Sequence, residues 1–299
     1  MGDVHAQLSY DVTFTETLKD YLSLAKPGII LGNSVSVVGG FLLASRGNID
    51  IALMVDTLLG IALVIASGCV FNNFIDREID RKMSRTRSRT LARNAIPSVN
   101  AIIYALVLGI SGVAILLMET GGLCASLVVL GFTVYVIFYS FYLKRRSLYA
   151  TYVGSIAGAI PPVAGYCAVT GHFDLGSGIL FFIFVLWQMP HCYALAIVRS
   201  RDYLAAGIPV APIRLGTLTA KRHIIFFIFA FLAASIMLTF TGFTGYLYLG
   251  VITALGTVWL RVAFKEYKVS DDGRWAKLMF HFSLICILVL SFMMSIDFK

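Results

Sequence analysis

Charged residues are scarce in this chain. Only 13% of its 299 residues are Asp, Glu, Lys or Arg, whereas a soluble domain carries roughly 25%. Hydrophobic residues make up 59%, and the mean hydropathy is +0.85. This composition excludes a soluble globular protein and predicts a protein that crosses the membrane several times.

Other absences narrow the class of protein further. The first 20 residues contain no apolar run ending at a small-residue cleavage site, so we expect no secretory signal peptide. The cysteines form no C-x-x-C pair and lie in or beside apolar segments, which predicts small buried side chains rather than disulfides or zinc ligands. They are Cys69, Cys124, Cys167, Cys192 and Cys286. The net charge of +8 does not indicate nucleic-acid binding, because the basic residues lie between apolar segments.

The apolar segments are long enough to cross a bilayer. They cover residues 27–45, 51–74, 99–118, 122–143, 151–170, 178–198, 223–241, 244–264 and 277–296. Pro161 and Pro162 lie in the middle of the fifth segment, and we expect them to kink or break that helix. The sequence thus predicts an all-α integral membrane protein of nine transmembrane helices, with residues 1–20 as an N-terminal tail and 21–299 as a single domain.

Lysine and arginine alternate between the two predicted sides of the membrane. All but two of the 24 lie in the N-terminal tail or after the second, fourth, sixth and eighth segments; the exceptions are Arg46 and Lys299. The positive-inside rule therefore predicts a cytoplasmic N-terminus and a periplasmic C-terminus. The long polar connections 75–98 and 199–222 then both face the cytoplasm, where we expect the active site.

A polar stripe ends the second apolar segment. Asn72, Asp76 and Asp80 are four residues apart, so on a helix they share one face. Carboxylate and amide oxygens suit a magnesium ion that also binds a diphosphate. The plainer alternative is a basic loop that sets topology and binds anionic lipid. It accounts for Arg87 and Arg93, but not for polar side chains at membrane depth.

Basic residues next to the stripe are candidate ligands of the diphosphate, since guanidinium and ammonium groups bind phosphate oxygens. These candidates are Arg77, Lys82, Arg85, Arg89, Lys144 and Arg145. Arg77 directly follows Asp76 and joins the stripe as a candidate catalytic residue. Lys144 and Arg145 have a second interpretation, as a topological anchor beside an aromatic belt. In the first interpretation a nearby tyrosine such as Tyr139 faces a developing carbocation.

A second group lies near the end of the sixth segment. His191 follows Pro190 there, and Arg199, Asp202 and Tyr203 come soon after. A lone histidine in an apolar helix is more often a packing residue, although neutral imidazole is also a good iron ligand. On the first segment, Lys26 and Asn33 form a weaker group, because an amide in a spanning helix often binds only a neighbouring helix.

At these residues the chain resembles a known family. The spacing Asn72-x-x-x-Asp76-x-x-x-Asp80 is similar to the first aspartate-rich motif of the UbiA superfamily of intramembrane prenyltransferases. Further stretches resemble the bacterial branch that farnesylates heme. They are Ala25-Lys26-Pro27-Gly28-Ile29-Ile30 with Asn33, Cys69-Val70-Phe71-Asn72-Asn73-Phe74-Ile75-Asp76-Arg77, Trp187-Gln188-Met189-Pro190-His191, Arg201-Asp202-Tyr203 and Ile208-Pro209-Val210.

The resemblance implies a UbiA-type bundle in the inner membrane that uses Mg²⁺. It implies that farnesyl diphosphate, heme b and water give heme O and diphosphate, in heme O biosynthesis for terminal oxidases, with a heme A synthase or an oxidase as assembly partners. The metal ligands would be Asn72, Asp76 and Asp80. The residues for heme or another acceptor would be His191, Arg199, Asp202, Tyr203, Asn33 and Tyr139.

One departure from the superfamily pattern bears on the acceptor. Members with aromatic acceptors carry a second aspartate-rich motif, whose positions fall here on Cys192, Arg199 and Asp202. Only Asp202 is acidic, which disfavours a 4-hydroxybenzoate or chlorophyllide acceptor and predicts that the first stripe carries most of the metal binding. A headgroup transferase is disfavoured because no Asp-Gly-x-x-Ala-Arg run is present. A transporter is disfavoured because the polar groups cluster at one membrane face.

Overall fold

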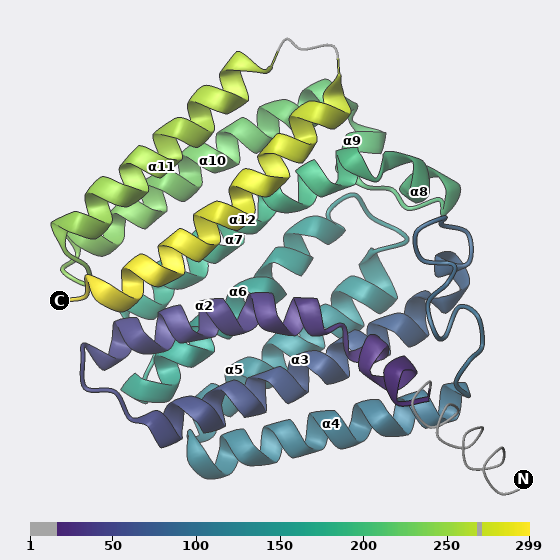
Figure 1. Cartoon of the computed structure of the whole chain (residues 1–299), viewed down its shortest axis with the longest axis horizontal. Helices are drawn as coiled ribbons and strands as arrows, with labels where there is room; N and C mark the ends of the chain where they lie inside the picture. Colours follow the sequence, from purple (N-terminus) through teal and green to yellow (C-terminus); the bar gives the residue numbers. More distant parts are fainter. Residues whose placement is uncertain (1–16, 268–270) are drawn as a thin grey trace, which may run out of the picture.

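The computed structural model describes residues 17–267 and 271–299, and this part of the chain is helical (Figure 1). Nine of its helices are long and apolar enough to cross a membrane, as predicted. They are α2 (Pro27–Ser45), α3 (Ile51–Asp80), α4 (Ser98–Glu119), α5 (Gly122–Thr133) with its π-helical continuation η1 (Val134–Leu143), α6 (Ala150–Thr170), α7 (Leu175–Val198), α10 (Thr217–Phe240), α11 (Tyr246–Lys265) and α12 (Asp272–Ile296). Most of the predicted tail, and with it the signal-peptide expectation, lies outside the described residues.

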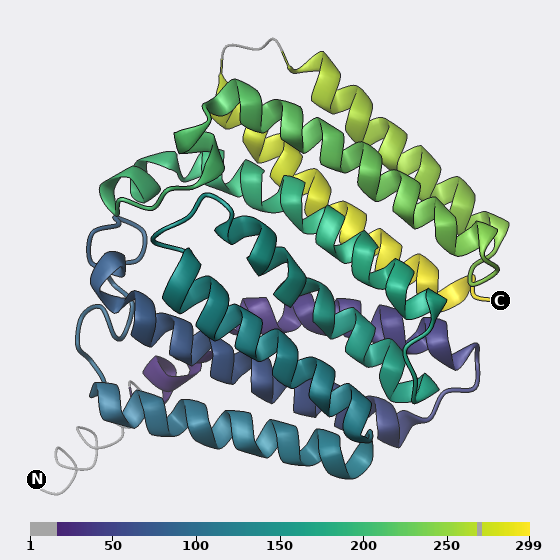
Figure 2. The ribbon, with the colours of Figure 1, turned by 180° about the vertical axis from the view of Figure 1, so that it is seen from behind.

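Helix α6 lies at the centre of the bundle. It packs against α2, α5 and α7, and α12 in turn packs against α2 and α7 (Figures 1 and 2). The α2–α6 contact depends on glycine, because a Cβ atom on Gly40 would lie 2.1 Å from the carbonyl oxygen of Pro162. Pro161 and Pro162 are buried inside α6, and the helix continues through both. Of the predicted kink or break, the break is therefore wrong.

Several helices begin or end beyond the limits predicted from hydropathy. Helix α3 continues to Asp80 rather than ending at residue 74, so the whole polar stripe is helical. Helix α7 starts at Leu175, where Asp174 and Ser177 form a capping box. Helix α10 starts at Thr217 and includes Lys221, which is only 3% exposed and whose charge is paired with Asp272 at 2.6 Å. Polar residues that are paired or that cap a helix lower the mean hydropathy of a segment, but they do not end the helix.

The connections divide between the two ends of the bundle. The residues after α3 and η1, and the short helices α8 (Ser200–Ala205) and α9 (Ala211–Arg214), lie at one end (Figure 1). The short turns after α2 and α10 and the C-terminus lie at the other end. This division agrees with the alternation of basic residues, and the cytoplasmic assignment stays a prediction. All five cysteines carry free thiols, and all but Cys192 are buried, as expected.

Candidate active site

The polar stripe of α3 is buried. Asp76 is 0% exposed, Asp80 2% and Asn72 4%. A charge at such a position is costly unless it is paired or coordinates a metal. The end of α3 is helical because neighbouring elements supply partners for these side chains.

Asp76 accepts hydrogen bonds through one oxygen only. Its Oδ2 accepts hydrogen bonds from Lys144, just beyond η1, and from Asn72 Nδ2 at 2.8 Å. Its Oδ1 is buried without a hydrogen-bond partner and lies 4.0 Å from Arg145 Nη2. A buried carboxylate oxygen without a partner calls for an explanation. Asp76 Oδ1 is therefore suited to binding a cation.

Asn72 is fully engaged by its neighbours. Its amide nitrogen donates to Asp76 and to Ser140 Oγ, the latter at 3.2 Å. Its amide oxygen accepts from Lys26 Nζ at 2.7 Å. In this arrangement Asn72 orients Asp76, and its role as a metal ligand stays a prediction. Ser140 was not singled out from the sequence, although a lone serine one helical turn before Lys144 in an apolar helix was a signal.

Lys26 belongs to the site more closely than its weak sequence signal indicated. It precedes Pro27 at the start of α2 and has a left-handed backbone, φ 54° and ψ 68°. Burial lowers the pKa of Lys26 to about 8; nearby Cys69 and Asp76 raise it and Arg89 and Lys144 lower it. Lys26 therefore lies within electrostatic range of both halves of the stripe.

Asp80 is held by the loop that follows it. Arg89 Nη1 donates to both carboxylate oxygens of Asp80, at 2.8 and 3.1 Å. Thr86 Oγ1 donates to the backbone oxygen of Asp80 at 3.0 Å. Arg81 closes the loop by donating to the carbonyl of Ala92 at 2.8 Å. The connection after α3 is thereby folded back over the helix end and returns Arg89 to the stripe.

The other candidate diphosphate ligands differ in how close they lie to the two carboxylates. Arg145 donates to the carbonyl of Ile75 beside Asp76. Arg77 lies over the ring of Phe74 and donates to its carbonyl, so it contacts its own helix. Lys82 is exposed and Arg77 is partly buried, and within the described residues neither forms a hydrogen bond or ion pair with Asp76 or Asp80.

Helix α8 brings the second predicted group toward the first. Asp202 accepts hydrogen bonds from the backbone nitrogen and hydroxyl of Ser84, at 3.0 and 2.8 Å, in the loop after α3. Burial raises the pKa of Tyr203, which also feels the charges of Arg199, Arg85 and Asp76. The pKa of Arg85 is lowered by burial and then by Arg199. Tyr203 therefore lies within electrostatic range of both Asp76 and Arg199 at the end of α7.

His191 is fixed away from the carboxylates. Its ring stacks on Trp187 with centroids 5.0 Å apart and lies 4.8 Å from the ring of Phe280. Ser283 Oγ donates its only proton to the carbonyl of Phe280 at 2.6 Å. The 2.8 Å bond between Ser283 Oγ and His191 Nδ1 must then be donated by Nδ1. Neutral His191 consequently carries its lone pair on Nε2.

The remaining two acceptor candidates make local contacts. Asn33 Nδ2 donates to the carbonyl of Ile29 on its own helix at 2.8 Å. Tyr139 stacks on Tyr135 at 5.8 Å and lies 6.0 Å from Lys144 Nζ. Tyr139 is thus beside the Asp76 pair, whereas Asn33 has no contact with it in the described chain.

The donor set fits a divalent cation that is shared with a substrate. Within residues 17–267 and 271–299 no group of three His, Cys, Asp or Glu side chains is placed to hold a metal. Magnesium, however, is often bound by one or two carboxylates together with substrate phosphates and water. The unpartnered Oδ1 of Asp76 beside several cationic groups matches that mode of binding.

Comparison with known proteins gives consistent results. The model of the "UbiA prenyltransferase family" matches residues 33–285. A protoheme IX farnesyltransferase of Yersinia pseudotuberculosis is 53% identical over 282 residues, covering 94% of this chain and 96% of that protein.

Solved structures share the fold. A digeranylgeranylglyceryl phosphate synthase aligns with a TM-score of 0.73 and 20% identity, over 92% of this chain and 99% of that one. A UbiA homologue from Archaeoglobus fulgidus bound to GPP and Mg²⁺ aligns with a TM-score of 0.69 and 14% identity, over 92% and 99% of the two chains. At these identities the likeness is one of fold.

Proposed function

The chain belongs to the UbiA prenyltransferase family, and from this membership we propose that it transfers a farnesyl group from farnesyl diphosphate to a vinyl group of heme b. The products are heme O and diphosphate. The 53% identity to a protoheme IX farnesyltransferase supports this acceptor. The observation that carries the proposal is the buried pair Asp76 and Asp80, surrounded by cationic side chains.

Asp76 and Asp80 would hold Mg²⁺, with Asp76 Oδ1 as the oxygen that accepts no hydrogen bond from the described residues. Bound there, the ion would act as a Lewis acid and neutralise charge on the diphosphate. Asn72 orients the Asp76 carboxylate by hydrogen bonding to its other oxygen.

The cations around the stripe bind the diphosphate and stabilise it as a leaving group. Lys144 and Arg89 are already paired with the two carboxylates, and Lys26 and Arg145 lie beside them. Such preorganised charges favour the transition state, in which negative charge develops on the bridging oxygen. Arg85 and Lys82 are the outer members of this set, and Arg77 is a peripheral candidate because it contacts its own helix.

The transfer proceeds by cleavage of the C1–O bond of farnesyl diphosphate, with both electrons leaving on the diphosphate. The electrons of a heme vinyl group then form the new bond to C1. The cation left next to the porphyrin takes the oxygen of a water molecule, which loses a proton and becomes a hydroxyl group. Tyr139, beside Lys144, offers an aromatic face to the allylic cation.

His191 would hold the heme through its iron. Its Nδ1–H is bound to Ser283, so Nε2 is the free ligand atom, and metal-binding histidines typically donate their other ring nitrogen in this way. Arg199 pairs with a propionate, and Tyr203 and Asp202 shape the space between heme and diphosphate. Asn33, on α2, stays a candidate for binding heme.

The enzyme acts in the bacterial inner membrane, with its active site toward the cytoplasm. The farnesyl chain of the substrate lies between the helices and is open to lipid. The distribution of basic residues supports this orientation. A heme A synthase or a terminal oxidase is the partner that receives the product.

Extraction and mass analysis of heme pigments tests the function. Cells that contain the protein should accumulate a farnesylated derivative of heme b that is absent without it. Asp76→Ala and Asp80→Ala should each abolish this product while the protein still inserts in the membrane. Normal product from either variant would exclude the metal assignment.

A further inference from the structure

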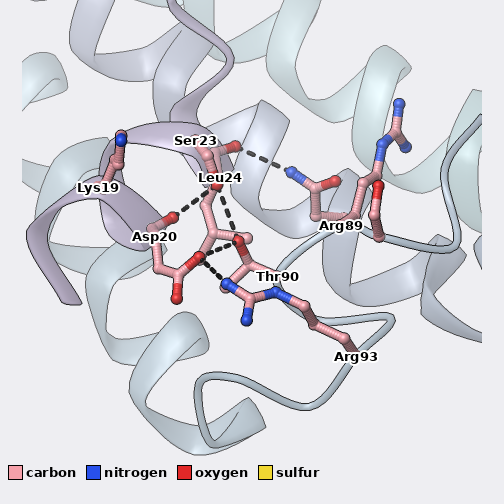
Figure 3. A pocket seen from close by; sticks show the side chains of 9 residues that line it. Lys19, Asp20, Ser23, Leu24, Arg89, Thr90 and Arg93 are labelled. Atoms are coloured by element: carbon pink, nitrogen blue, oxygen red, sulfur yellow. Dashed lines mark hydrogen bonds and ion pairs between the residues drawn. The ribbon is translucent and has the colours of Figure 1, made fainter. Parts of the chain in front are cut away.

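A polar pocket of about 580 Å³ lies between the N-terminal helical segment, residues 17–25, and the loop after α3 (Figure 3). Its lining residues are Lys19, Asp20, Ser23, Leu24, Asn73, Ser88, Arg89, Thr90 and Arg93. Only Arg89 among them has a place in the proposed mechanism. The acidic member, Asp20, has no assigned role.

Asp20 ties the N-terminal segment to the loop. Its Oδ1 accepts from Arg93 Nη2 at 2.5 Å and from Thr90 Oγ1 at 3.0 Å (Figure 3). Ser23 Oγ adds a contact of 2.8 Å to the same Thr90 hydroxyl. On the other side, the carbonyl of Leu24 accepts from Asn73 on α3 at 2.9 Å. The segment therefore bridges α3 and the returning loop.

Thr90 connects the N-terminal segment to the candidate active site. It is 3% exposed and directly follows Arg89, whose guanidinium binds both oxygens of Asp80. An arginine side chain has many rotamers, so its aim depends on a fixed backbone at its base. Asp20 holds the loop at residues 90 and 93, immediately beyond that base.

We propose that Asp20 is a positioning residue, which acts through Thr90 and Arg93 to fix the loop backbone and so aims Arg89 at Asp80 and at the diphosphate. The inference rests on the proposed function of the Asp76–Asp80 site. A purely stabilising role is disfavoured, because the Asp20–Arg93 pair is partly exposed, at 19% and 53%, and such pairs add little to stability.

Asp20 and Arg89 are tested together in a double-mutant cycle of the full chain, purified in detergent. Asp20→Ala should raise the KM for farnesyl diphosphate roughly tenfold. It should have little effect in a chain that already carries Arg89→Ala, because its path to the substrate is then gone. Asp20→Asn keeps an acceptor for Thr90 and should give a smaller rise.

Lys19→Ala is the matched control, since Lys19 lines the same pocket without holding the loop. It should leave KM unchanged. Additive effects of Asp20→Ala and Arg89→Ala would overturn the inference. So would an equal effect of Lys19→Ala, which would indicate an anion site in the pocket, or a lower melting temperature at unchanged KM.

Binding of inorganic diphosphate with Mg²⁺, measured by calorimetry on the same variants, separates this inference from the proposed reaction. It requires no acceptor. Weaker binding in Asp20→Ala but not in Lys19→Ala supports the positioning role even if the wild-type protein fails to farnesylate heme. Equal binding in all of these variants overturns it.

Discussion

The two halves of the candidate site use opposite chemistry. At the end of α3, the buried carboxylates are paired with Arg89 and Lys144 from two other segments, and Lys26 donates to the amide oxygen of Asn72. On α7, His191 is fixed by one neutral hydrogen bond and two aromatic rings. The first half is built to handle a highly charged group, and the second to hold a large apolar one. Variants can test whether the halves act separately.

Removal of the Asp76 charge should have the largest effect. Asp76→Asn keeps the shape of the side chain but loses the anion that pairs with Lys144 and would hold Mg²⁺. We expect the rate of heme O formation to fall on the order of 10³-fold or more, measured as initial rate in detergent. Glu78→Gln on the same helix, whose side chain is 57% exposed, should stay near the wild-type rate. Similar losses in both variants would contradict the site.

Substitutions of Arg89 and Arg77 should differ in their effect on kcat/KM, although both residues lie near the stripe in sequence. Arg89→Gln should lower kcat/KM for farnesyl diphosphate roughly 10²-fold, because the guanidinium on Asp80 is lost. Arg77→Gln should change it by less than about threefold, since Arg77 contacts its own helix. A titration of farnesyl diphosphate against rate measures both. The reverse order would show that the loop rearranges around the substrate.

His191→Ala should affect heme without affecting farnesyl diphosphate. We expect the Soret spectrum of added heme to lose the signature of histidine ligation. Ser283→Ala should weaken heme binding about tenfold, because the Nδ1–H bond that orients the ring is removed. The KM for farnesyl diphosphate should not change in either variant. Ser295→Ala, which loses a local bond to Ser291 farther along α12, is the control. An unchanged Soret band in His191→Ala would exclude iron ligation.

The smallest effect concerns pH. Lys26 is charged below its pKa of about 8 and neutral above it, so kcat/KM for farnesyl diphosphate should decline as the pH rises through 8. By pH 9 about one tenth of the Lys26 side chains keep their charge. In Lys26→Arg this inflection should move out of the measured range. A profile that is identical in the two proteins would assign the inflection to another group.

The same pKa predicts a change in stability of defined sign. Burial depresses the Lys26 pKa from 10.5 in the unfolded chain to about 8 in the folded one. Between these values the unfolded state binds more protons, so the contribution of Lys26 to stability rises with pH across that window. Below about 8 both states are protonated and this contribution is constant. Comparing the melting temperatures of wild type and Lys26→Met from pH 7 to 10 measures the difference.

Several features could be predicted from the sequence because they depend on local pattern. Apolar length located the nine spans, and the spacing of four placed Asn72, Asp76 and Asp80 on one face of α3. The predicted end of α3 at residue 74 was too early, because hydropathy counts buried paired aspartates as loop residues. The start of α10 was missed for the same reason at Lys221.

Pairing across the bundle could not be predicted from the sequence. Lys26 and Ser140 are far from Asn72 in the chain and reach it only through packing of α2 and η1 against α3. The proposed role of Asp20 depends on the fold of a loop 70 residues away, where the Thr90 hydroxyl donates a hydrogen bond to the Asp20 carboxylate. Hydropathy and spacing carry no information about such contacts.

The sequence by itself determined that this is a nine-helix membrane protein with a carboxylate stripe at one end, because composition and helical periodicity are local properties. Tertiary structure alone decided which cation meets which carboxylate. It turned the amide oxygen of Asn72 toward Lys26 and left Asp76 Oδ1 without a hydrogen-bond donor. It also placed Ser283 where the Nδ1–H group of His191 can donate to it. These outcomes depend on the distances between side chains from different helices, which only the packed bundle defines.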